Sequence, residues 1–262
     1  MAEWLFVSHY VSDNLTLRAG RLRLPQFLFS ETLLITQTYN WVRPPIELYR
    51  LLAGLHRFNG FSAVFKRGFQ NSFLEAEIYR GQAKDELSTL GLSTLFNTKS
   101  LYGGRLRYVT DNLIVNVAAS DITTVVDIPA LNYGITTGSL LSAVGLQFLQ
   151  ERWGVTSEYG NLDIKSLSDA SAYYLSLHYI VNQWTSFITF GGSIIDTDSA
   201  AEEFTGESLT IGCRYDVSDS MSLKAQVLNG ELLDATAILS VGTTPGFDEE
   251  VTVISMTLDF IY

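Results

Sequence analysis

The chain has 262 residues, of which 28 are acidic and 17 are basic, so its formal net charge is −11. This acidic balance excludes a nucleic-acid partner that is bound through bulk charge. Apolar residues make up 47% of the chain and charged residues only 17%, below the roughly 25% typical of soluble domains, so an ordinary soluble enzyme surface is not expected.

Short segments with alternating apolar and polar residues run through the whole chain, separated by polar turns and longer acidic or Gly/Thr-rich connections. Most of them approach the roughly 9–11 residues with which a tilted strand crosses a bilayer. The chain has no uninterrupted apolar run of the roughly 18 residues that a membrane-spanning helix requires. In chain order, the alternation predicts about thirteen strands, at 4–10, 15–24, 58–67, 71–80, 101–109, 113–121, 139–150, 154–162, 171–181, 185–194, 207–216, 221–231 and 250–262.

Tight turns alternate with long connections along this series of strands. Asp13-Asn14, Asp111-Asn112 and Asp219-Ser220 each follow a segment with an aromatic residue, and Asp and Asn suit such turns because they tolerate left-handed backbone conformations. Tight turns on one side and long loops on the other predict an antiparallel up-and-down sheet that crosses a membrane repeatedly.

The segment 171–181 shows the expected division between two faces. Tyr173, Leu175 and Leu177 share one face, while Tyr174 and Ser176 share the other. An apolar outer band and a polar interior are typical of a membrane barrel. A soluble sandwich produces the same alternation, so periodicity alone does not distinguish the two folds.

One connection, 25–57, is too long for a simple hairpin and too rich in apolar residues to be disordered. Pro44-Pro45 interrupts both helix and strand. After it, 46–57 is predicted to form a short helix with an apolar face. We expect this loop to pack inside the fold.

The C-terminal segment ends in an alternating apolar face that includes Phe260 and the final residue, Tyr262. This ending resembles the assembly signal of Gram-negative outer-membrane barrels, which implies the barrel insertion machinery as a partner and Phe260 and Tyr262 as the signal.

The whole chain resembles the general bacterial porins, sixteen-stranded barrels whose third external loop folds into the lumen. Trp41-Val42-Arg43-Pro44-Pro45 is similar to a segment of porin-like proteins. In that family the inward loop follows the fifth strand, whereas here the long loop follows the second. The resemblance therefore implies one porin-like β-barrel domain over 1–262 that lacks three N-terminal strands and a signal peptide. It also implies the Gram-negative outer membrane, contact with its lipid and lipopolysaccharide, and a homotrimer.

A porin needs no catalytic group, but it needs charges that set the field at a constriction. Because Arg18 and Arg21 fall on opposite strand faces, a bulge at Ala19-Gly20 is predicted, which would turn three arginines into the lumen. The porin resemblance implies a passive diffusion channel for small hydrophilic solutes and ions, and the arginines expected in the lumen predict a weak preference for anions. The candidate pore-lining residues are Arg18, Arg21, Arg23, Glu31, Arg43, Glu47, Lys66, Glu75, Glu77, Arg105, Arg107, Arg214 and Lys224.

Two other interpretations stay open. A non-conducting outer-membrane barrel, acting as a structural, adhesion or receptor protein, would hold loop 25–57 outside the lumen. A soluble β-sandwich binding module would stay folded without detergent. No enzyme, cofactor or metal is predicted, because His9, His56 and His178 lack ligand spacing and Cys213 is the single cysteine.

Overall fold

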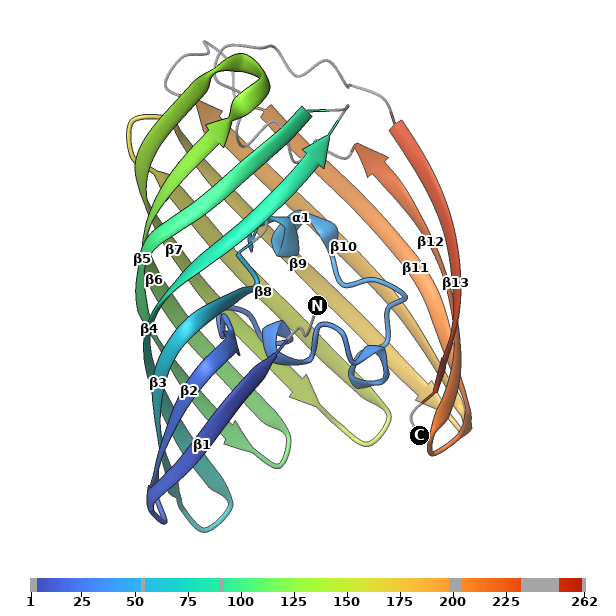
Figure 1. Cartoon of the computed structure of the whole chain (residues 1–262). Helices are drawn as coiled ribbons and strands as arrows, with labels where there is room; N and C mark the ends of the chain where they lie inside the picture. Colours follow the sequence, from blue (N-terminus) through green and yellow to red (C-terminus); the bar gives the residue numbers. More distant parts are fainter. Residues whose placement is uncertain (1–3, 53–54, 90–91, 198–203, 232–249, 261–262) are drawn as a thin grey trace.

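The computed structural model describes residues 4–52, 55–89, 92–197, 204–231 and 250–260. In these residues, thirteen strands form one sheet in which each strand pairs antiparallel with its neighbours in the chain. The sheet curls into a barrel wall around an interior (Figure 1). The strands are β1 Leu5–Ser12, β2 Leu15–Arg23, β3 Arg57–Gly68, β4 Ser72–Thr89, β5 Leu92–Thr110, β6 Leu113–Ile128, β7 Tyr133–Leu149, β8 Trp153–Ile164, β9 Ser168–Val181, β10 Trp184–Thr197, β11 Phe204–Ser218, β12 Met221–Glu231 and β13 Glu250–Phe260.

The all-β, antiparallel, up-and-down fold predicted from the alternation is therefore confirmed, strand by strand. The tight turns lie together at one end of the sheet, the lower end in Figure 1. Asn182, in the turn between β9 and β10, has φ 54, a left-handed conformation that Asn tolerates. At the other end, β4 and β5 extend to 18 and 19 residues, several residues beyond their predicted length.

The two faces of the sheet differ as the sequence predicts. On β9, Leu175 and Leu177 are 46% and 47% exposed, whereas the neighbouring Tyr174 and Ser176 are buried. The outward residues of β13, from Ile254 to Phe260, are likewise exposed. An outward apolar band of this kind is the lipid-facing surface of a membrane barrel. No second sheet covers it in the described residues, which argues against the soluble sandwich.

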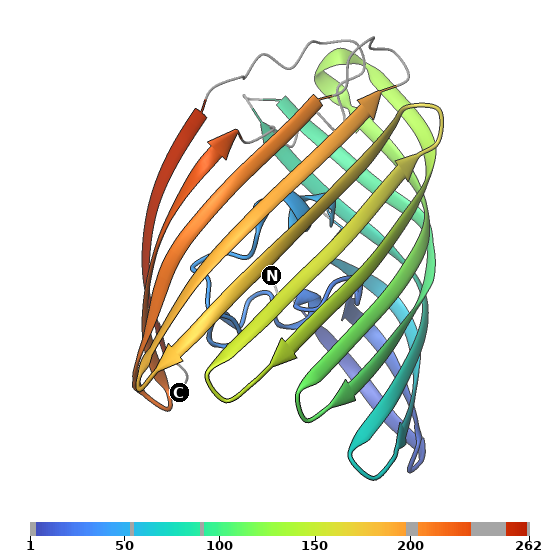
Figure 2. The ribbon, with the colours of Figure 1, turned by 180° about the vertical axis from the view of Figure 1, so that it is seen from behind.

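The sheet is open along one side. β1 pairs only with β2, and β13 pairs only with β12, over the residues that the structure describes. Seen from behind, the wall from β4 to β12 is continuous (Figure 2).

Tyr262 of the predicted assembly signal lies outside the described residues, and Phe260 points outward from β13. None of the described helices is long and apolar enough to cross a membrane.

The connection between β2 and β3, which we call the inner loop (24–56), lies inside the barrel (Figure 1), as predicted. It contains three 3-10 turns, Ser30–Thr32 (η1), Thr36–Thr38 (η2) and Arg50–Leu52 (η3), and one short helix, Ile46–Tyr49 (α1). The predicted helix over 46–57 is therefore too long. Among the residues of this segment that the structure describes, 46–52 is helical and 55–57 is not. Here α1 gives way to a tighter 3-10 turn that keeps Leu48, Leu51 and Leu52 buried against the curved wall.

The hydrophobic core lies between the inner loop and the inner face of the wall. Phe27, Trp41 and Leu48 of the loop are at most 4% exposed. Small residues of the wall make room for them: a side chain at Gly160 of β8 would place its Cβ 2.9 Å from both Leu48 and Phe27. The wall is thus shaped for this loop, and the loop fills part of the lumen.

Candidate functional site

A cluster of charged side chains joins the inner loop to the wall at β2, β4 and β5. At its centre, the guanidinium of Arg105 is 2.6 Å from Glu31, 2.7 Å from Glu75 and 3.0 Å from Glu77. Arg18 of β2 lies 3.7 Å from Glu31 and 4.0 Å from Glu77. With Arg107, these residues form what we call the charge cluster, in which three cations balance three carboxylates.

The strand register assembles most of this cluster. Glu75 pairs with Arg107 and Glu77 with Arg105 across β4 and β5, so both carboxylates and both guanidinium groups point into the lumen. Glu31 reaches them from η1 of the loop. Burial by itself would raise the pKa of the Glu31 carboxyl, but the nearby Arg105, Arg18 and Arg107 hold that pKa below its usual range. Glu31 is therefore ionised at neutral pH.

Arg107 differs from the other two cations of the cluster. It is partly buried, and it has no ion pair with any residue that the structure describes. Its strand neighbours are Glu75 on β4 and Asn116 on β6. Arg107 is thus the cation of this cluster with the greatest capacity to attract a passing anion.

On the opposite wall, two predicted pore-lining cations hold the inner loop instead of facing open lumen. Lys224 of β12 is fully buried, and its Nζ donates hydrogen bonds to the carbonyls of Thr36, Tyr39 and Trp41, the last two at 2.8 and 3.2 Å. It also pairs with Asp259 of β13 at 3.0 Å. These contacts fasten the loop to the far side of the barrel.

Arg214 of β11 does the same from the adjacent strand. Its guanidinium donates to the carbonyls of Gln37 and Tyr39 at 2.8 and 3.2 Å, and its Nε pairs with Asp216 at 2.7 Å. Because the charges of both Lys224 and Arg214 are compensated locally, the sequence prediction that they line an aqueous pore needs correction. They point inward, but their role in the structure is to bind the loop.

Two buried carboxylates complete the attachment of the loop. Glu47 of α1 is 2% exposed and accepts a hydrogen bond from Ser208 of β11. Glu158 of β8 accepts hydrogen bonds from the Leu28 amide at 2.6 Å and from the hydroxyls of Tyr49 and Tyr174 at 2.9 and 2.8 Å.

Burial and the nearby Glu158 raise the pKa of Tyr49 well above its usual value, so the phenol of this loop residue stays protonated and donates. Burial also raises the pKa of Tyr39 to about 12. The loop therefore presents neutral phenols to the wall at every pH at which proteins usually function.

The remaining predicted site residues lie apart from the charge cluster. Arg43 donates to Ser255 of β13 at 3.1 Å in an exposed position. Lys66 lies near the tight-turn end of β3, with its Nζ 3.8 Å from the centre of the Phe73 ring. Arg23 is buried, and its guanidinium lies 5.5 Å from the Trp4 ring.

The predicted bulge at Ala19-Gly20 is wrong. The pairing of β2 with β1 and β3 continues without a shift through these residues. Gly20 adopts φ 137, which a residue without Cβ does at little steric cost and without an inserted residue. Strand alternation therefore places Arg21 on the outward face, opposite Arg18, where it donates to Asn59 at 3.3 Å.

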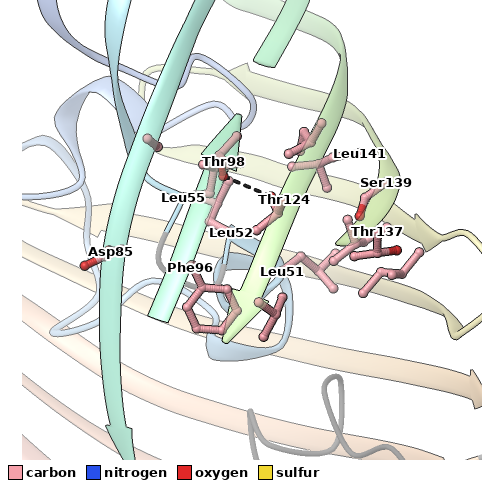
Figure 3. A pocket seen from close by; sticks show the side chains of 15 residues that line it. Leu51, Leu52, Leu55, Asp85, Phe96, Thr98, Thr124, Thr137, Ser139 and Leu141 are labelled. Carbon is pink, nitrogen blue, oxygen red and sulfur yellow. Dashed lines mark hydrogen bonds between the residues drawn. The ribbon is translucent and has the colours of Figure 1, made fainter. Parts of the chain in front are cut away.

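An apolar cavity of about 80 Å³ lies between the loop and the wall of β4 to β8. Leu51, Leu52 and Leu55 line it from the loop side, and the hydroxyls of Thr98 and Thr124 are hydrogen-bonded to each other at its wall (Figure 3). The apolar lining departs from the polar interior expected of a porin. Here the loop is attached by hydrophobic packing and not by charge.

Trp41 is a site residue that the sequence did not identify as one. Its Nε1 donates to Thr189 of β10 at 2.8 Å, and its ring lies 5.6 Å from that of Tyr174 and 6.5 Å from that of Phe187. The many aromatic residues of the loop were the sequence signal for such a residue, but the partners of Trp41 are more than a hundred residues away in the chain.

Among the described residues, no group of three or more His, Cys, Asp or Glu could hold a metal ion.

No family model matches the chain, and no curated protein matches it by sequence. Solved structures do match. Outer-membrane expressed OmpT of Vibrio cholerae aligns with a TM-score of 0.62 and 9% identity over 95% of this chain and 77% of that one. The in-vitro folded trimer form of that protein aligns with a TM-score of 0.58 and 10% identity over the same shares of the two chains.

An anion-selective porin from Comamonas acidovorans aligns with a TM-score of 0.60 and 14% identity, over 86% of this chain and 66% of that one. At these identities the likeness concerns the fold, which is that of outer-membrane β-barrels. The shared fold and the outward apolar band agree with the outer-membrane location that the sequence predicts.

Proposed function

We propose that this chain is an outer-membrane channel through which small hydrophilic solutes and ions diffuse passively. The observation that carries the proposal is the charge cluster: Glu31 of the inner loop meets Arg18 and Arg105 of the wall inside the barrel. Opposed charges on a loop and a facing wall create a transverse field, which orders water and raises the cost of passage for apolar solutes.

A weak preference for anions forms part of the proposal. It rests on Arg107, whose charge is not compensated by an ion pair with the described residues, and on Lys66 at the tight-turn end. The charge cluster as a whole, with three cations and three carboxylates, carries no net charge, so we expect only a weak preference. The name of the Comamonas acidovorans porin is consistent with this direction.

Single-channel recording in a planar bilayer tests the proposal. We expect stepwise, salt-dependent openings and a reversal potential on the anion side in a salt gradient. Arg107→Gln should move the reversal potential toward cations, whereas Arg67→Gln, an outward residue of β3, should leave it unchanged. Strong cation preference of the unmodified protein would contradict the anion assignment.

A second candidate is a barrel whose lumen is plugged by the inner loop. It differs from the non-conducting barrel predicted from the sequence, because the loop lies inside the lumen and not outside it (Figure 1). The inner loop is bonded to both sides of the lumen, at Glu158 on one side and at Lys224 on the other. Under this alternative the unmodified protein is silent, and a Lys224→Met variant, which loosens the far attachment, gains conductance. Openings of equal size in the unmodified protein and in Lys224→Met would exclude a lumen that is plugged by the inner loop.

The finer features of the porin resemblance belong to the same proposal. Strands in addition to the thirteen would pair with the free edges of β1 and β13 and give a sixteen-stranded general porin. The homotrimer, the recognition of Phe260 by the insertion machinery and the absence of enzymatic activity remain predictions. Chemical cross-linking in native membranes tests the trimer.

A further inference from the structure

The apolar cavity between the inner loop and the wall is lined by aliphatic side chains from both sides. Leu51 and Leu52 line it from η3 of the loop, and Ile122 and Leu141 line it from β6 and β7. Each of these four side chains is at most 4% exposed. One end of the cavity is therefore apolar and enclosed by the loop and the wall.

The other end of the cavity lies further from the tight turns. In the wall, Thr98 pairs with Thr124, and Thr124 pairs with Thr137. In the next row toward the end opposite the tight turns, Asp85 of β4 pairs with Phe96 of β5. Both Asp85 and Phe96 line the cavity and are half-buried. The cavity thus leads from a buried apolar end to a partly exposed end that carries one carboxylate.

The threonine hydroxyls in the cavity wall are bonded within the wall. Those of Thr98 and Thr124 lie 2.9 Å apart and share a hydrogen bond (Figure 3). The hydroxyl of Thr137 donates to the carbonyl of Gly138 at 3.4 Å. An ordered water needs about two to four polar partners, and these hydroxyls already have partners. An apolar group therefore enters the cavity without displacing a firmly held water from them.

The volume of the cavity limits the size of that group. The cavity measures about 80 Å³, whereas an apolar cavity that binds benzene measures roughly 150 Å³. A short branched chain of carbon atoms suits the smaller volume, and an aromatic ring does not.

Asp85 gives the partly exposed end its charge. It lies at the edge of the lining, to one side of the leucines in Figure 3. Its Oδ1 accepts a hydrogen bond from the amide of Glu86 at 2.9 Å, and it forms no ion pair within the part of the chain that the structure describes. The carboxylate is thus placed to pair with a cationic group whose apolar part occupies the cavity.

We propose that this cavity binds small primary amines with a short branched aliphatic chain. The chain lies between the leucines and the wall, and the ammonium group pairs with Asp85. An alcohol of the same shape lacks the ion pair, and a carboxylate of the same shape is repelled by Asp85. The site is separate from the charge cluster, since Glu75 and Glu77 lie nearer the tight-turn end of β4. The inference goes beyond the proposed channel and does not depend on conduction.

Nuclear magnetic resonance of the leucine methyl groups measures this binding at the site. The protein carries isotope-labelled leucine and is refolded in deuterated detergent. Isobutylamine, isobutanol and isovalerate serve as probes, because they share the isobutyl group and differ in charge at about pH 7. We expect isobutylamine to shift the resonances of Leu51 and Leu52 saturably. Isobutanol should bind about fivefold more weakly, and isovalerate more weakly still.

Two variants separate the ion pair from the apolar contact. Asp85→Asn should lower the affinity for isobutylamine to that for isobutanol. Asp127→Asn removes an exposed, outward carboxylate of β6 near the same end, and it should leave both affinities unchanged. Ala83→Leu fills the cavity from β4 without a change of charge, and it should abolish saturable binding of both probes. Heat-modifiable migration on a gel verifies that each variant is folded.

Several outcomes would overturn the proposal. Equal affinity for isobutylamine and isobutanol in the unmodified protein would mean that Asp85 does not bind the ammonium group. Equal losses in Asp85→Asn and Asp127→Asn would assign the effect to the overall negative charge. Shifts that grow linearly with concentration and persist in Ala83→Leu would show that the probes only partition into the detergent. Benzylamine that binds as tightly as isobutylamine would contradict the size of the site.

Discussion

At the residue scale, the charge cluster depends on a single guanidinium that is shared by carboxylates from two elements. Arg105 binds Glu31 of the loop and Glu75 and Glu77 of β4, and its side chain is 3% exposed. Without that cation, three carboxylates would share a confined space with only Arg18 and Arg107 to balance them, which is unfavourable. Arg105 therefore both links the loop to the wall and permits a high density of acid groups in the lumen.

The pKa of Glu31 gives the first prediction. Because its folded-state pKa lies below the unfolded value, ionised Glu31 stabilises the fold at neutral pH, and this contribution is lost as the pH falls through the folded-state pKa. The side chain is 36% exposed, so after solvent screening we expect the Glu31→Gln variant to be less stable by about 1 kcal/mol at pH 7.

Urea unfolding in micelles as a function of pH measures this difference. We expect the difference in the free energy of unfolding between the unmodified protein and Glu31→Gln to stay constant down to about pH 5 and to disappear below about pH 4. A difference that disappears near neutral pH would contradict the assignment of Glu31 as a carboxylate held ionised by arginines.

At the scale of the element, the inner loop has little regular structure of its own and depends on the wall for its conformation. The one α-helix in its described residues, α1, has four residues, too few to be stable alone. Hydrogen bonds and ion pairs join the loop to strands from β2 to β13, and Trp41 provides a packing anchor against β9 and β10.

Truncation of this anchor is the second prediction. We expect Trp41→Ala to destabilise the docked loop by about 3–5 kcal/mol, because it removes a buried ring and the hydrogen bond to Thr189. Limited proteolysis within 24–56 should become faster, and any channel current should become noisier. Leu34→Ala, at a loop position that is 58% exposed, serves as the control and should change neither measurement.

At the scale of the whole molecule, the outward surface is suited to lipid over the middle of each strand and to headgroups at the ends. Leu175 lies in the central part of β9, and Asp169 lies on the same outward face near the end of the strand. An arginine in hydrocarbon is costly, whereas the same residue near the headgroups is tolerated.

This depth dependence is the third prediction. In lipid vesicles, Leu175→Arg should lower the free energy of unfolding by about 2–4 kcal/mol, and Asp169→Arg by about 0–1 kcal/mol. Equal losses at the two positions would mean that the outward face does not lie across a bilayer.

The amino-acid sequence by itself determined the strands and their faces. Alternation with a period of two is a local property, so Leu175 and Tyr174 could be assigned to opposite faces without knowledge of any neighbour. The same rule identified the inward positions of Glu77, Arg105 and Lys224, and the apolar content of 25–57 indicated that this loop would be buried.

The tertiary structure alone decided what those inward residues do. Lys224 and Arg214 meet loop carbonyls that are between 175 and 188 residues away in the chain, and no local pattern encodes such a pairing. At Arg21 the alternation of strand faces was right, and the bulge that was predicted to turn this side chain into the lumen was wrong, because the pairing of β2 with β1 and β3 continues without a shift. Side-chain direction follows from the backbone period, but the partner of a side chain depends on how distant segments come together in space.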